Sequence, residues 1–288
     1  FIIGENPVLS DPDANHVKAA LKHLDFLVVQ DIFLSETAEL ADVVLPAVSF
    51  AEKGGTVTNT ERRIQLMRPA IRPIGQARSD SDIICDLATR MGYPMRYRSS
   101  ADVMQEIAEL TPIYGGVTHE RVEAEGLQWP CRSTEDPGTP YLHQGQFTRG
   151  LGKFLPVEYL EAQELPDAEY TFLLTTGRML YHWHTGTLTR RSRALHHIVP
   201  EGYVELNPKD ARGLGVESEE WVHIESRRGE VTVRARVTEI VPPGTAFMPF
   251  HFREAAANLL THAALDPISK IPEYKVCAVK IARDTSKT

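Results

Sequence analysis

The sequence contains little cysteine: Cys85, Cys131 and Cys277 are the only three in 288 residues. No two of them are close enough to form a CxxC pair, the usual signature of a zinc, iron–sulfur or redox site. We therefore expect no metal site and no iron–sulfur cluster in this chain. Free cysteine is most often buried and unreactive, so we expect three inert thiols in a reducing compartment.

Long apolar runs and a surplus of basic residues are also missing. Runs such as Phe26–Val29 and Val43–Leu45 are far shorter than the roughly 20 apolar residues that span a bilayer, and no charged-then-apolar signal segment opens the chain. We expect no membrane insertion by this chain and a cytoplasmic location. The formal net charge is −8, whereas a nucleic-acid binder normally has a basic surplus, so we expect no nucleic-acid partner.

The first part of the chain alternates between strand and helix patterns. Three apolar runs, Phe1–Ile3, Phe26–Val29 and Val43–Leu45, predict buried strands, and Ala14–Leu24 has apolar residues at helical spacing. Strand, helix, strand, short helix, strand is typical of a doubly wound parallel sheet. Because the chain opens on a strand, we expect it to start inside this α/β domain, which we place at residues 1–115.

Two more helices are expected before the pattern ends. One begins near Asp80 or Ser81, either of which can cap it, and ends before Gly92. The other covers Ala101–Leu110. Glycine and proline then become dense and the periodicity disappears, so we interpret residues 116–165 as a connecting loop.

From residue 166 onward, the sequence changes to short strands separated by turns. Apolar and polar residues alternate along Glu230–Val237, as in a strand with one buried face. Several such strands predict a compact β-barrel domain over residues 166–288. The expected strands are Tyr170–Thr175, Val204–Leu206, Trp221–Glu225, Glu230–Val237, Thr245–Phe250 and Lys275–Ile281.

The segment Thr171–Pro200 contains no aspartate or glutamate, although an even spread of the 39 acids would place about four there. It carries four arginines and four histidines, so in an acidic chain it is a candidate site for an anion. Thr176-Gly177-Arg178 follows an expected strand, where glycine lets backbone N–H groups approach a phosphate and arginine adds charge. The alternative is a solvated basic face that acids elsewhere balance.

Two histidines in this segment raise the question of a metal. His182 and His184 would share one face of a strand. Zinc needs three or four protein ligands, however, and no acid or cysteine is near them in the sequence. We therefore favour hydrogen bonds to a polar cofactor.

Other polar groups follow the expected α/β strands. Gly4-Glu5-Asn6 and Gln30-Asp31 stand at strand ends, the edge where doubly wound sheets bind ligands. Asp80 could reach the same ligand, or could simply cap its helix. Near the end of the chain, Arg253 and Glu254 fit a surface ion pair better than an acid–base pair.

Several long motifs resemble those of one enzyme family. The stretch Thr175–Arg191 (TTGRMLYHWHTGTLTRR) is similar to the dinucleotide-binding segment of molybdenum bis-pterin oxidoreductases, which include formate dehydrogenases and nitrate reductases. The resemblance covers nearly the whole chain except about Ser99–Glu164. Further segments in family order are Val28–Asp31, Ala41–Pro46, Asn59–Gln65, Phe250–Leu260, Asp266–Lys270 and Glu273–Val279. Within the family, Gly4–Pro7 and His251–Asn258 are most similar to formate dehydrogenases.

The resemblance implies two molybdopterin guanine dinucleotides, carrying molybdenum or tungsten and bound head to tail. One would rest on the α/β part, with its guanosine end near Gln30, Asp31, Lys53 and Asp80, and with Gly4, Glu5 and Asn6 close by. The other would rest on a barrel of the double-psi type. Its binding residues would be Thr176, Gly177, Arg178, Met179, Leu180, Tyr181, His182, Trp183, His184, Thr185, Phe250, Asn258 and Lys275.

No residue of this chain is assigned a catalytic role. In the family, an N-terminal Cys motif holds a 4Fe-4S cluster, a Cys or selenocysteine followed by His meets the metal, and an Arg orients formate. None has a matching position here, so we expect the N-terminal half of the same enzyme, or a separate catalytic subunit, to supply them. We expect this chain alone to be inactive.

The activity that the resemblance implies is oxidation of formate to CO2, with electrons passing to iron–sulfur clusters. Electron-transfer subunits with iron–sulfur or flavin groups are the implied partners. Two alternatives stay open. One is a periplasmic or assimilatory nitrate reductase of the same family. The other is a non-catalytic, cofactor-holding or structural module related to the large subunit of respiratory complex I.

Overall fold

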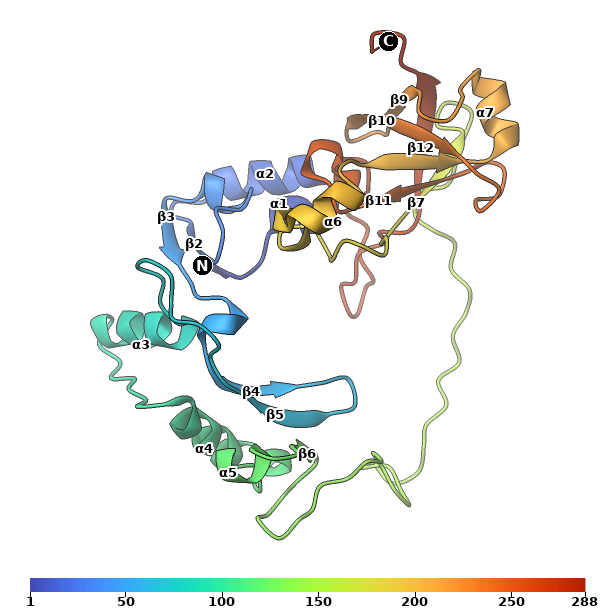
Figure 1. The fold of residues 1–288 in the computed structure, drawn as a ribbon. Coiled ribbons are helices and arrows are strands. Elements are labelled where there is room, and N and C mark those ends of the chain that lie inside the picture. The colour runs from blue at the N-terminus through green and yellow to red at the C-terminus, as the bar shows by residue number, and fades with distance from the viewer. Residues whose placement is uncertain (288) are drawn as a thin grey trace. The chain divides into compact units, whose positions relative to one another are not determined.

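The computed structural model describes residues 1–287, and its elements are labelled in Figure 1. The chain divides into two compact units. The first comprises Phe1–Val29, Leu34–Val44 and the described chain from Tyr159 onward, and the second comprises Gln30–Phe33 and Leu45–Glu158. Among the described residues, no helix is both long enough and apolar enough to cross a membrane.

The first unit contains a closed barrel of six strands in the order β10-β8-β11-β7-β12-β9. β7 is parallel to β11 and β8 is parallel to β10, while the other neighbours are antiparallel. The predicted C-terminal barrel is therefore confirmed. Its strands are β7 (Phe172–Gly177), β8 (Tyr203–Leu206), β9 (Trp221–Glu225), β10 (Glu230–Val237), β11 (Thr245–Pro249) and β12 (Cys277–Arg283).

Alternating residues fill the barrel. Along β10, Val231, Val233 and Ala235 are buried, while Thr232 and Arg234 between them are not. Burying a valine, leucine or isoleucine fully contributes about 1.5–3 kcal/mol, so this interior stabilises the unit strongly. The other strands supply Phe172, Leu174, Val204, Leu206, Val222, Ile224, Ala246, Met248, Cys277, Val279 and Ile281.

Several strand ends differ from the expected ones by one to two residues, and two of these differences affect the site described below. β7 continues to Gly177 instead of ending at Thr175. β12 begins at Cys277 instead of Lys275. Lys275 therefore lies in a turn and is not part of the strand ladder.

Helical turns surround these strands in the first unit. α7 starts at Pro208, with Asn207 as its N-cap and Gly215 in the left-handed conformation at its end. The helices are α1 (Pro7–Ser10), α2 (Ala14–Lys22), η1 (Ala38–Leu40), η4 (Thr189–Arg191), α6 (Arg193–Ile198), α7 (Pro208–Leu214), η5 (Arg253–Ala255) and η6 (Ala257–Leu259).

The α/β part has a three-stranded sheet in the order β1 (Ile2–Ile3), β2 (Val28–Asp31) and β3 (Val43–Pro46). Only the central strand is well covered, since Val29 is fully buried whereas Ile3, Val43 and Val44 are about 40% exposed. The expectation of a buried strand is thus wrong for β1 and β3. Each is an outer strand with one neighbour, so among the described residues little apolar surface covers it.

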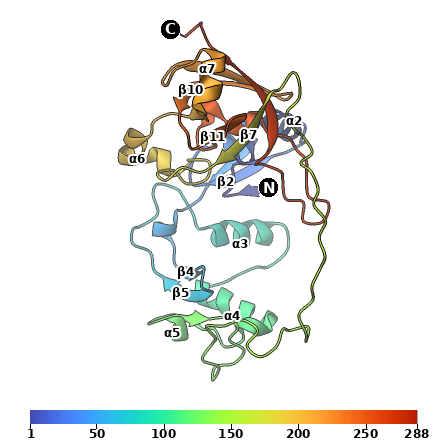
Figure 2. The same ribbon diagram turned by 90° about the vertical axis from the view of Figure 1, so that its right-hand side faces the viewer.

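The second unit is built around the hairpin of β4 (Gly55–Thr58) and β5 (Arg63–Met67), to which β6 (Leu127–Gln128) adds. α4 (Ser100–Leu110) lies against this hairpin, as both views show (Figures 1 and 2). The small core is made of Ile64, Met104, Val117, Val122 and Cys131. The remaining helices are η2 (Phe50–Glu52), α3 (Asp80–Arg90), η3 (Pro112–Tyr114) and α5 (His119–Val122).

Part of the segment expected to be a connecting loop is ordered in this core. The Arg121 guanidinium donates to three backbone carbonyls. Nη1 donates to the carbonyls of Gly116 and Ser133, and Nη2 donates to that of Asp136 at 2.7 Å. A β-carbon on Gly116 would lie 1.9 Å from the Ser133 carbonyl oxygen, so only glycine fits there. Such contacts leave no periodic pattern. The domain boundaries at residues 115 and 165 stay a prediction.

The expected inert thiols are found at two of the three cysteines. Cys131 and Cys277 are buried, and burial raises the pKa of Cys277 to about 12. Cys85 is only partly buried. It lies on α3, whose apolar face is only partly covered: Ile84 and Leu87 are 38% and 40% exposed.

Candidate functional site

The loop after β7 begins from a firmly held strand end. Thr176 is 3% exposed, and its hydroxyl donates to the Tyr274 carbonyl at 2.8 Å. The Lys275 ammonium donates to the Thr176 carbonyl at 2.6 Å. A β-carbon on Gly177 would lie 2.5 Å from the Phe247 ring, so a larger residue at this position would have to displace that ring. These contacts hold the backbone of Thr176 and Gly177 in place at the end of the strand.

His251 fastens the loop that follows. Its ring is fully buried; Nε2 accepts from the Met179 N–H at 2.9 Å, and Nδ1 donates to the His184 carbonyl. Burial lowers the pKa of His251 below its ordinary value of 6.5, and the bond to His184 only partly opposes this. The neutral ring therefore joins both ends of Met179–His184. His251 was not among the residues predicted to bind the cofactor, although it belongs to the family-like motif His251–Asn258.

Exposed side chains of this loop make a basic and aromatic surface. The Arg178 guanidinium lies 4.8 Å from the centre of the Trp183 ring, and its Nη2 is 3.3 Å from His184 Nε2. Leu180 is 86% exposed and Trp183 is 57% exposed. Tyr181 is also exposed. The surface has no carboxylate from its own segment, so an anionic ligand would meet positive charge here.

Lys275 and Phe250 adjoin this surface. The Lys275 ammonium lies 5.4 Å from the centre of the Phe250 ring. Burial, and then the charge of Arg178, lower the pKa of Lys275. A second cation near Lys275 raises the cost of its charge, and a bound anion would relieve that cost.

Two expected binding residues face the protein interior instead. His182 is 4% exposed, and its nitrogens meet the Thr189 hydroxyl at 3.2 Å and the Val199 carbonyl at 2.8 Å. His182 therefore does not converge with the exposed His184, and the metal alternative gains no support. The Asn258 amide donates to the Leu9 and Ser10 carbonyls at 2.8 and 3.0 Å. Direct cofactor contact by either residue stays a prediction.

Thr185 ends this set. Its hydroxyl lies 2.8 Å from that of Thr187.

Arg253 and Glu254, expected to form one surface ion pair, each pair with another residue instead. Arg253 meets Glu36 at 2.9 Å, and Glu254 meets Arg190 at 2.6 Å.

In the second unit, three expected residues come together. Gln30 Nε2 donates to Asp80 Oδ1 at 2.7 Å, and the Lys53 ammonium meets the other oxygen at 2.5 Å. Burial raises the pKa of Asp80, but the bonds from Lys53 and Gln30 outweigh it and hold the pKa below its ordinary value. Asp31 is 9% exposed, and its Oδ1 accepts from the Phe33 N–H at 3.2 Å.

This cluster has free binding capacity. Gln30 is fully buried, yet its Oε1 has no hydrogen-bond partner within residues 1–287. Lys53 and Asp80 also line a pocket of 710 Å³. Ser79 caps α3 with its hydroxyl, so the expectation that Asp80 or Ser81 is the cap is wrong. The Asp80 carboxylate is thus available to the cluster, because the helix already has its cap one residue earlier.

Gly4, Glu5 and Asn6 belong to the first unit and follow β1. Gly4 and Glu5 are exposed, and Gly4 has a φ of +62°. Asn6 is buried: its amide donates to Glu36 at 2.7 Å and its oxygen accepts from the Thr37 hydroxyl at 2.8 Å. Asn6 therefore fastens the loop after β1 to the segment before η1.

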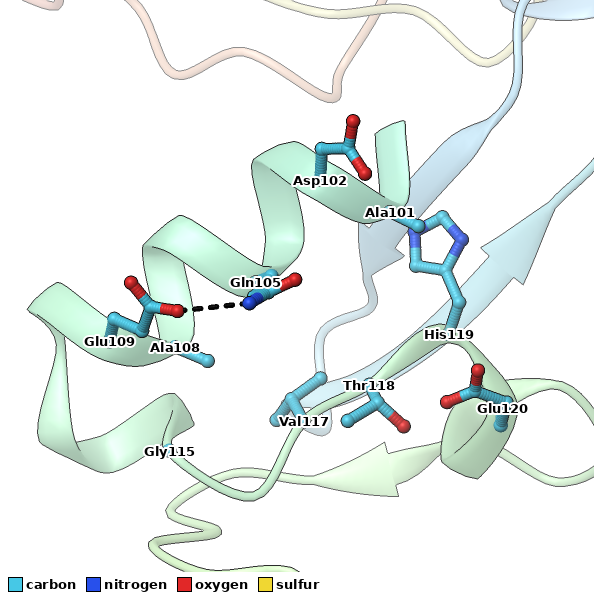
Figure 3. A pocket seen from close by; sticks show the side chains of 10 residues that line it. All are labelled: Ala101, Asp102, Gln105, Ala108, Glu109, Gly115, Val117, Thr118, His119 and Glu120. Carbon is cyan, nitrogen blue, oxygen red and sulfur yellow. Dashed lines mark hydrogen bonds between the residues drawn. The ribbon is translucent and has the colours of Figure 1, made fainter. Parts of the chain in front are cut away.

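A further pocket of 380 Å³ lies between α4 and residues 115–120 in the second unit (Figure 3). It contains none of the expected site residues. Its lining carries Asp102, Glu109 and Glu120, and Gln105 donates to Glu109 at 3.0 Å (Figure 3). This charge repels phosphate groups, so the pocket is a poor candidate for a dinucleotide.

Comparison with known proteins defines the class of this chain. The family described as "Molydopterin dinucleotide binding domain" matches residues 172–278, and the one described as "Molybdopterin oxidoreductase" matches residues 1–90. The closed barrel and its basic loop thus lie in the region that matches the dinucleotide-binding domain. The chain therefore contains a molybdopterin oxidoreductase region and a molybdopterin dinucleotide-binding domain.

Individual relatives agree with these matches. The F420-dependent formate dehydrogenase subunit alpha of Methanocaldococcus jannaschii is 54% identical over 287 residues, covering 98% of this chain and 43% of the relative. The assimilatory nitrate reductase catalytic subunit of Bacillus subtilis is 41% identical over 294 residues, covering 98% and 41%. The chain thus spans less than half the length of these relatives. Both alignments extend across Ser99–Glu164, where no motif was recognised in the sequence.

Among solved structures, acetylene hydratase from Pelobacter acetylenicus matches with a TM-score of 0.72 at 18% identity. The match covers 98% of this chain and 43% of that one. At this identity, the likeness shows the fold alone.

The residues present fit a pterin dinucleotide. Arg178 and Lys275 supply positive charge at the end of β7. The Gln30 oxygen, which has no partner among the described residues, can accept from an amino group such as that of guanine.

Proposed function

We propose that this chain is the cofactor-binding part of a formate dehydrogenase that oxidises formate to CO2. The observation that carries the proposal is the acid-free loop after β7, which His251 fastens at both ends and which presents Arg178 beside Lys275. The identity of 54% to a formate dehydrogenase subunit, against 41% to a nitrate reductase, favours formate over nitrate.

The cofactor of the proposal is bis-molybdopterin guanine dinucleotide with molybdenum or tungsten. When bound, it supplies the two-electron redox chemistry, and the protein supplies binding and electrostatics. On the barrel, Arg178 and Lys275 would meet phosphate oxygens, with the backbone from Thr176 to Thr185 around them. The exposed rings of Tyr181 and Trp183 would cover apolar parts of the ligand, next to Phe250.

On the α/β part, the guanosine end of the other dinucleotide would meet the Gln30 cluster. The free oxygen of Gln30 would accept from the guanine amino group, and Asp80 would accept from guanine or ribose donors. Lys53 holds Asp80 ionised, which keeps it an acceptor at neutral pH. Asp31 and the Gly4–Asn6 segment complete the proposed set.

In this proposal, His182 and Asn258 mainly hold neighbouring segments of the chain in place. Each uses its polar atoms on carbonyls of the protein. His182 holds the middle of the cofactor loop against the segment before Pro200. Asn258 holds the start of the chain against the barrel.

The proposed partners supply the catalytic and electron-transfer groups that were not assigned to any residue of this chain. The remaining part of the protein, or a separate catalytic subunit, would carry the 4Fe-4S cluster and the ligand of the metal. Iron–sulfur or flavin subunits would accept the electrons. We propose a cytoplasmic location for the assembly.

Retention of the cofactor tests this proposal. Denaturing the complete protein should release a GMP-containing pterin, together with molybdenum or tungsten. Replacing Arg178 by alanine should weaken cofactor retention roughly tenfold, because a hydrogen bond to a charged group contributes about 1.5–3 kcal/mol. Metal content after gel filtration, measured by mass spectrometry, is the readout.

A matched variant controls for loss of positive charge. Arg212→Ala removes an exposed guanidinium from α7, at the far end of its helix from the Asn207 cap, and should leave metal content unchanged. Equal metal content in Arg178→Ala and wild type would contradict the role of Arg178. Absence of any GMP-containing pterin would contradict the proposal as a whole.

A further inference from the structure

A basic pocket lies in the first unit, next to the loop of residues 178–185 that is proposed above to bind the cofactor (the cofactor loop). Its volume is 390 Å³, and Thr187, Arg190, Arg191, His196 and Arg253 contribute to its lining. Thr185 is the one lining residue that also belongs to the expected cofactor set. The pocket therefore has a lining of its own.

Two nitrogens of residues that line this pocket are buried and have no hydrogen-bond partner among the described residues. They are Nε of Arg190 and Nδ1 of His196. A buried N–H without a hydrogen-bond acceptor costs free energy, and such groups in native proteins often mark a place for a ligand or water. Arg190 Nε always carries a hydrogen and needs an acceptor, and His196 Nδ1 needs one in the tautomer that places the hydrogen there.

The position of Arg190 explains why its Nε is left over. Nη1 and Nη2 donate to the two oxygens of Glu254 at 2.7 and 2.6 Å. The guanidinium also lies 4.9 Å from the centre of the Phe252 ring. Its side chain is only 17% exposed. The ion pair and the ring hold the guanidinium in place, and the Nε–H is left for a ligand of the pocket that Arg190 lines.

The balance of charge around the pocket is positive. Three guanidinium groups, of Arg190, Arg191 and Arg253, stand against the carboxylates of Glu36 and Glu254. Both oxygens of Glu36 are occupied, by Arg253 at 2.9 Å and by the Asn6 amide at 2.7 Å. Arg253 has further N–H groups beyond that single contact. The pocket thus has more donors than the protein's own acceptors use.

We propose that this pocket binds an oxyanion group, a carboxylate or a phosphate. Arg190 Nε and His196 Nδ1 donate to it, and the guanidinium groups of Arg191 and Arg253 supply charge. The group has two sources: a free small anion, or a phosphate of the pterin dinucleotide. The proposal stands on the pocket itself and does not need the formate dehydrogenase activity.

Calorimetric titration with inorganic phosphate tests it. The complete protein is titrated in cofactor-loaded and cofactor-free form. Saturable binding of one phosphate per chain is expected in at least one form. Binding to the loaded protein identifies a free anion as the ligand, whereas binding to the cofactor-free protein alone identifies a phosphate of the dinucleotide.

Variants assign the binding to this pocket. Arg191→Gln combined with Arg253→Gln changes two exposed side chains and should weaken binding at least about tenfold. His196→Phe removes the unpartnered nitrogen with no change in guanidinium charge and should also weaken it. Arg212→Gln on α7 is the matched control and should bind as wild type.

Two results would overturn the proposal. One is no saturable phosphate binding in either form of the protein. The other is equal affinity in wild type and in the folded Arg191→Gln, Arg253→Gln variant. Failure of the formate dehydrogenase proposal would show instead as missing pterin, with phosphate binding intact.

Discussion

Single residues decide how the cofactor loop is held. His251 is the central one, because it accepts from Met179 and donates to His184 at the same time. Only the neutral ring can do both, since a protonated ring has no acceptor nitrogen. The loop is therefore held by a group whose charge state depends on pH.

Stability should fall in mild acid because of His251. Its pKa is lowered in the folded protein, so the unfolded chain binds a proton first as the pH drops. The stabilisation is complete above the ordinary value of 6.5 and is lost as the pH falls below it. Urea denaturation midpoints measured from pH 7.5 to 5 are the test.

Two variants separate the charge of His251 from its shape. His251→Gln keeps one acceptor and one donor but does not titrate, so its midpoint should vary less with pH. His251→Phe loses both bonds and should be less stable at every pH. A midpoint for His251→Gln that falls with pH as steeply as the wild type would rule out His251 as the source.

At the scale of residues, the sequence predicted which side chains gather at the loop but not which groups each side chain contacts. The basic character of the loop was evident from composition, and Thr176, Gly177, Arg178 and Lys275 do lie together. The inward direction of His182 was not evident. The residue type alone does not distinguish a histidine that bonds a buried carbonyl from one that faces a ligand.

At the scale of elements, two neighbouring residues at the start of α3 have different roles, one in capping the helix and the other in the proposed binding cluster. Ser79 caps the helix through the Asp82 N–H, while Asp80 faces Lys53 and Gln30. Ser79→Ala should destabilise the protein by about 0.5–2 kcal/mol, the usual cost of a lost N-cap. Asp80→Asn should leave the helix nearly as stable but weaken guanine-nucleotide retention.

Circular dichroism melting and nucleotide content, measured on both variants, check this division. Asp86→Asn is a control for nucleotide content on the same helix, because Asp86 pairs with Arg78 and Arg90 instead of the cluster. If Ser79→Ala lost as much nucleotide as Asp80→Asn at a temperature where it is folded, the proposed division would be wrong.

Elements with a regular pattern were predicted well. β9 and β10 match the expected residues, because alternation of buried and exposed side chains marks both ends of a strand. β1 and β3 exist as expected, but their exposure was misjudged, since an apolar run does not reveal what covers it. Residues 116–131 were missed because Arg121 and two glycines order them without periodicity.

At the scale of the whole molecule, this chain accounts for less than half of its relatives. It carries the groups proposed above to bind the cofactor, and no residue in it was assigned a catalytic role. We therefore predict that the remainder of the protein, or a companion subunit, contains a Cys-rich N-terminal motif and a Cys or selenocysteine followed by His. Sequencing the coding region upstream of Phe1 and its neighbouring genes checks this.

Either finding has a clear meaning. Both motifs upstream of Phe1 would place the reacting groups in the same polypeptide, and a companion gene would place them in another subunit. Their absence from both would contradict an enzymatic role and favour a module that only holds the cofactor.

The bond from Asn258 to the Leu9 and Ser10 carbonyls also constrains when this protein can fold. It joins residues that are 249 positions apart along the chain. At a synthesis rate of about 5–20 residues per second, α1 must wait roughly 12–50 s for its partner. During translation the first helix is therefore held by local contacts alone until Asn258 has been synthesised.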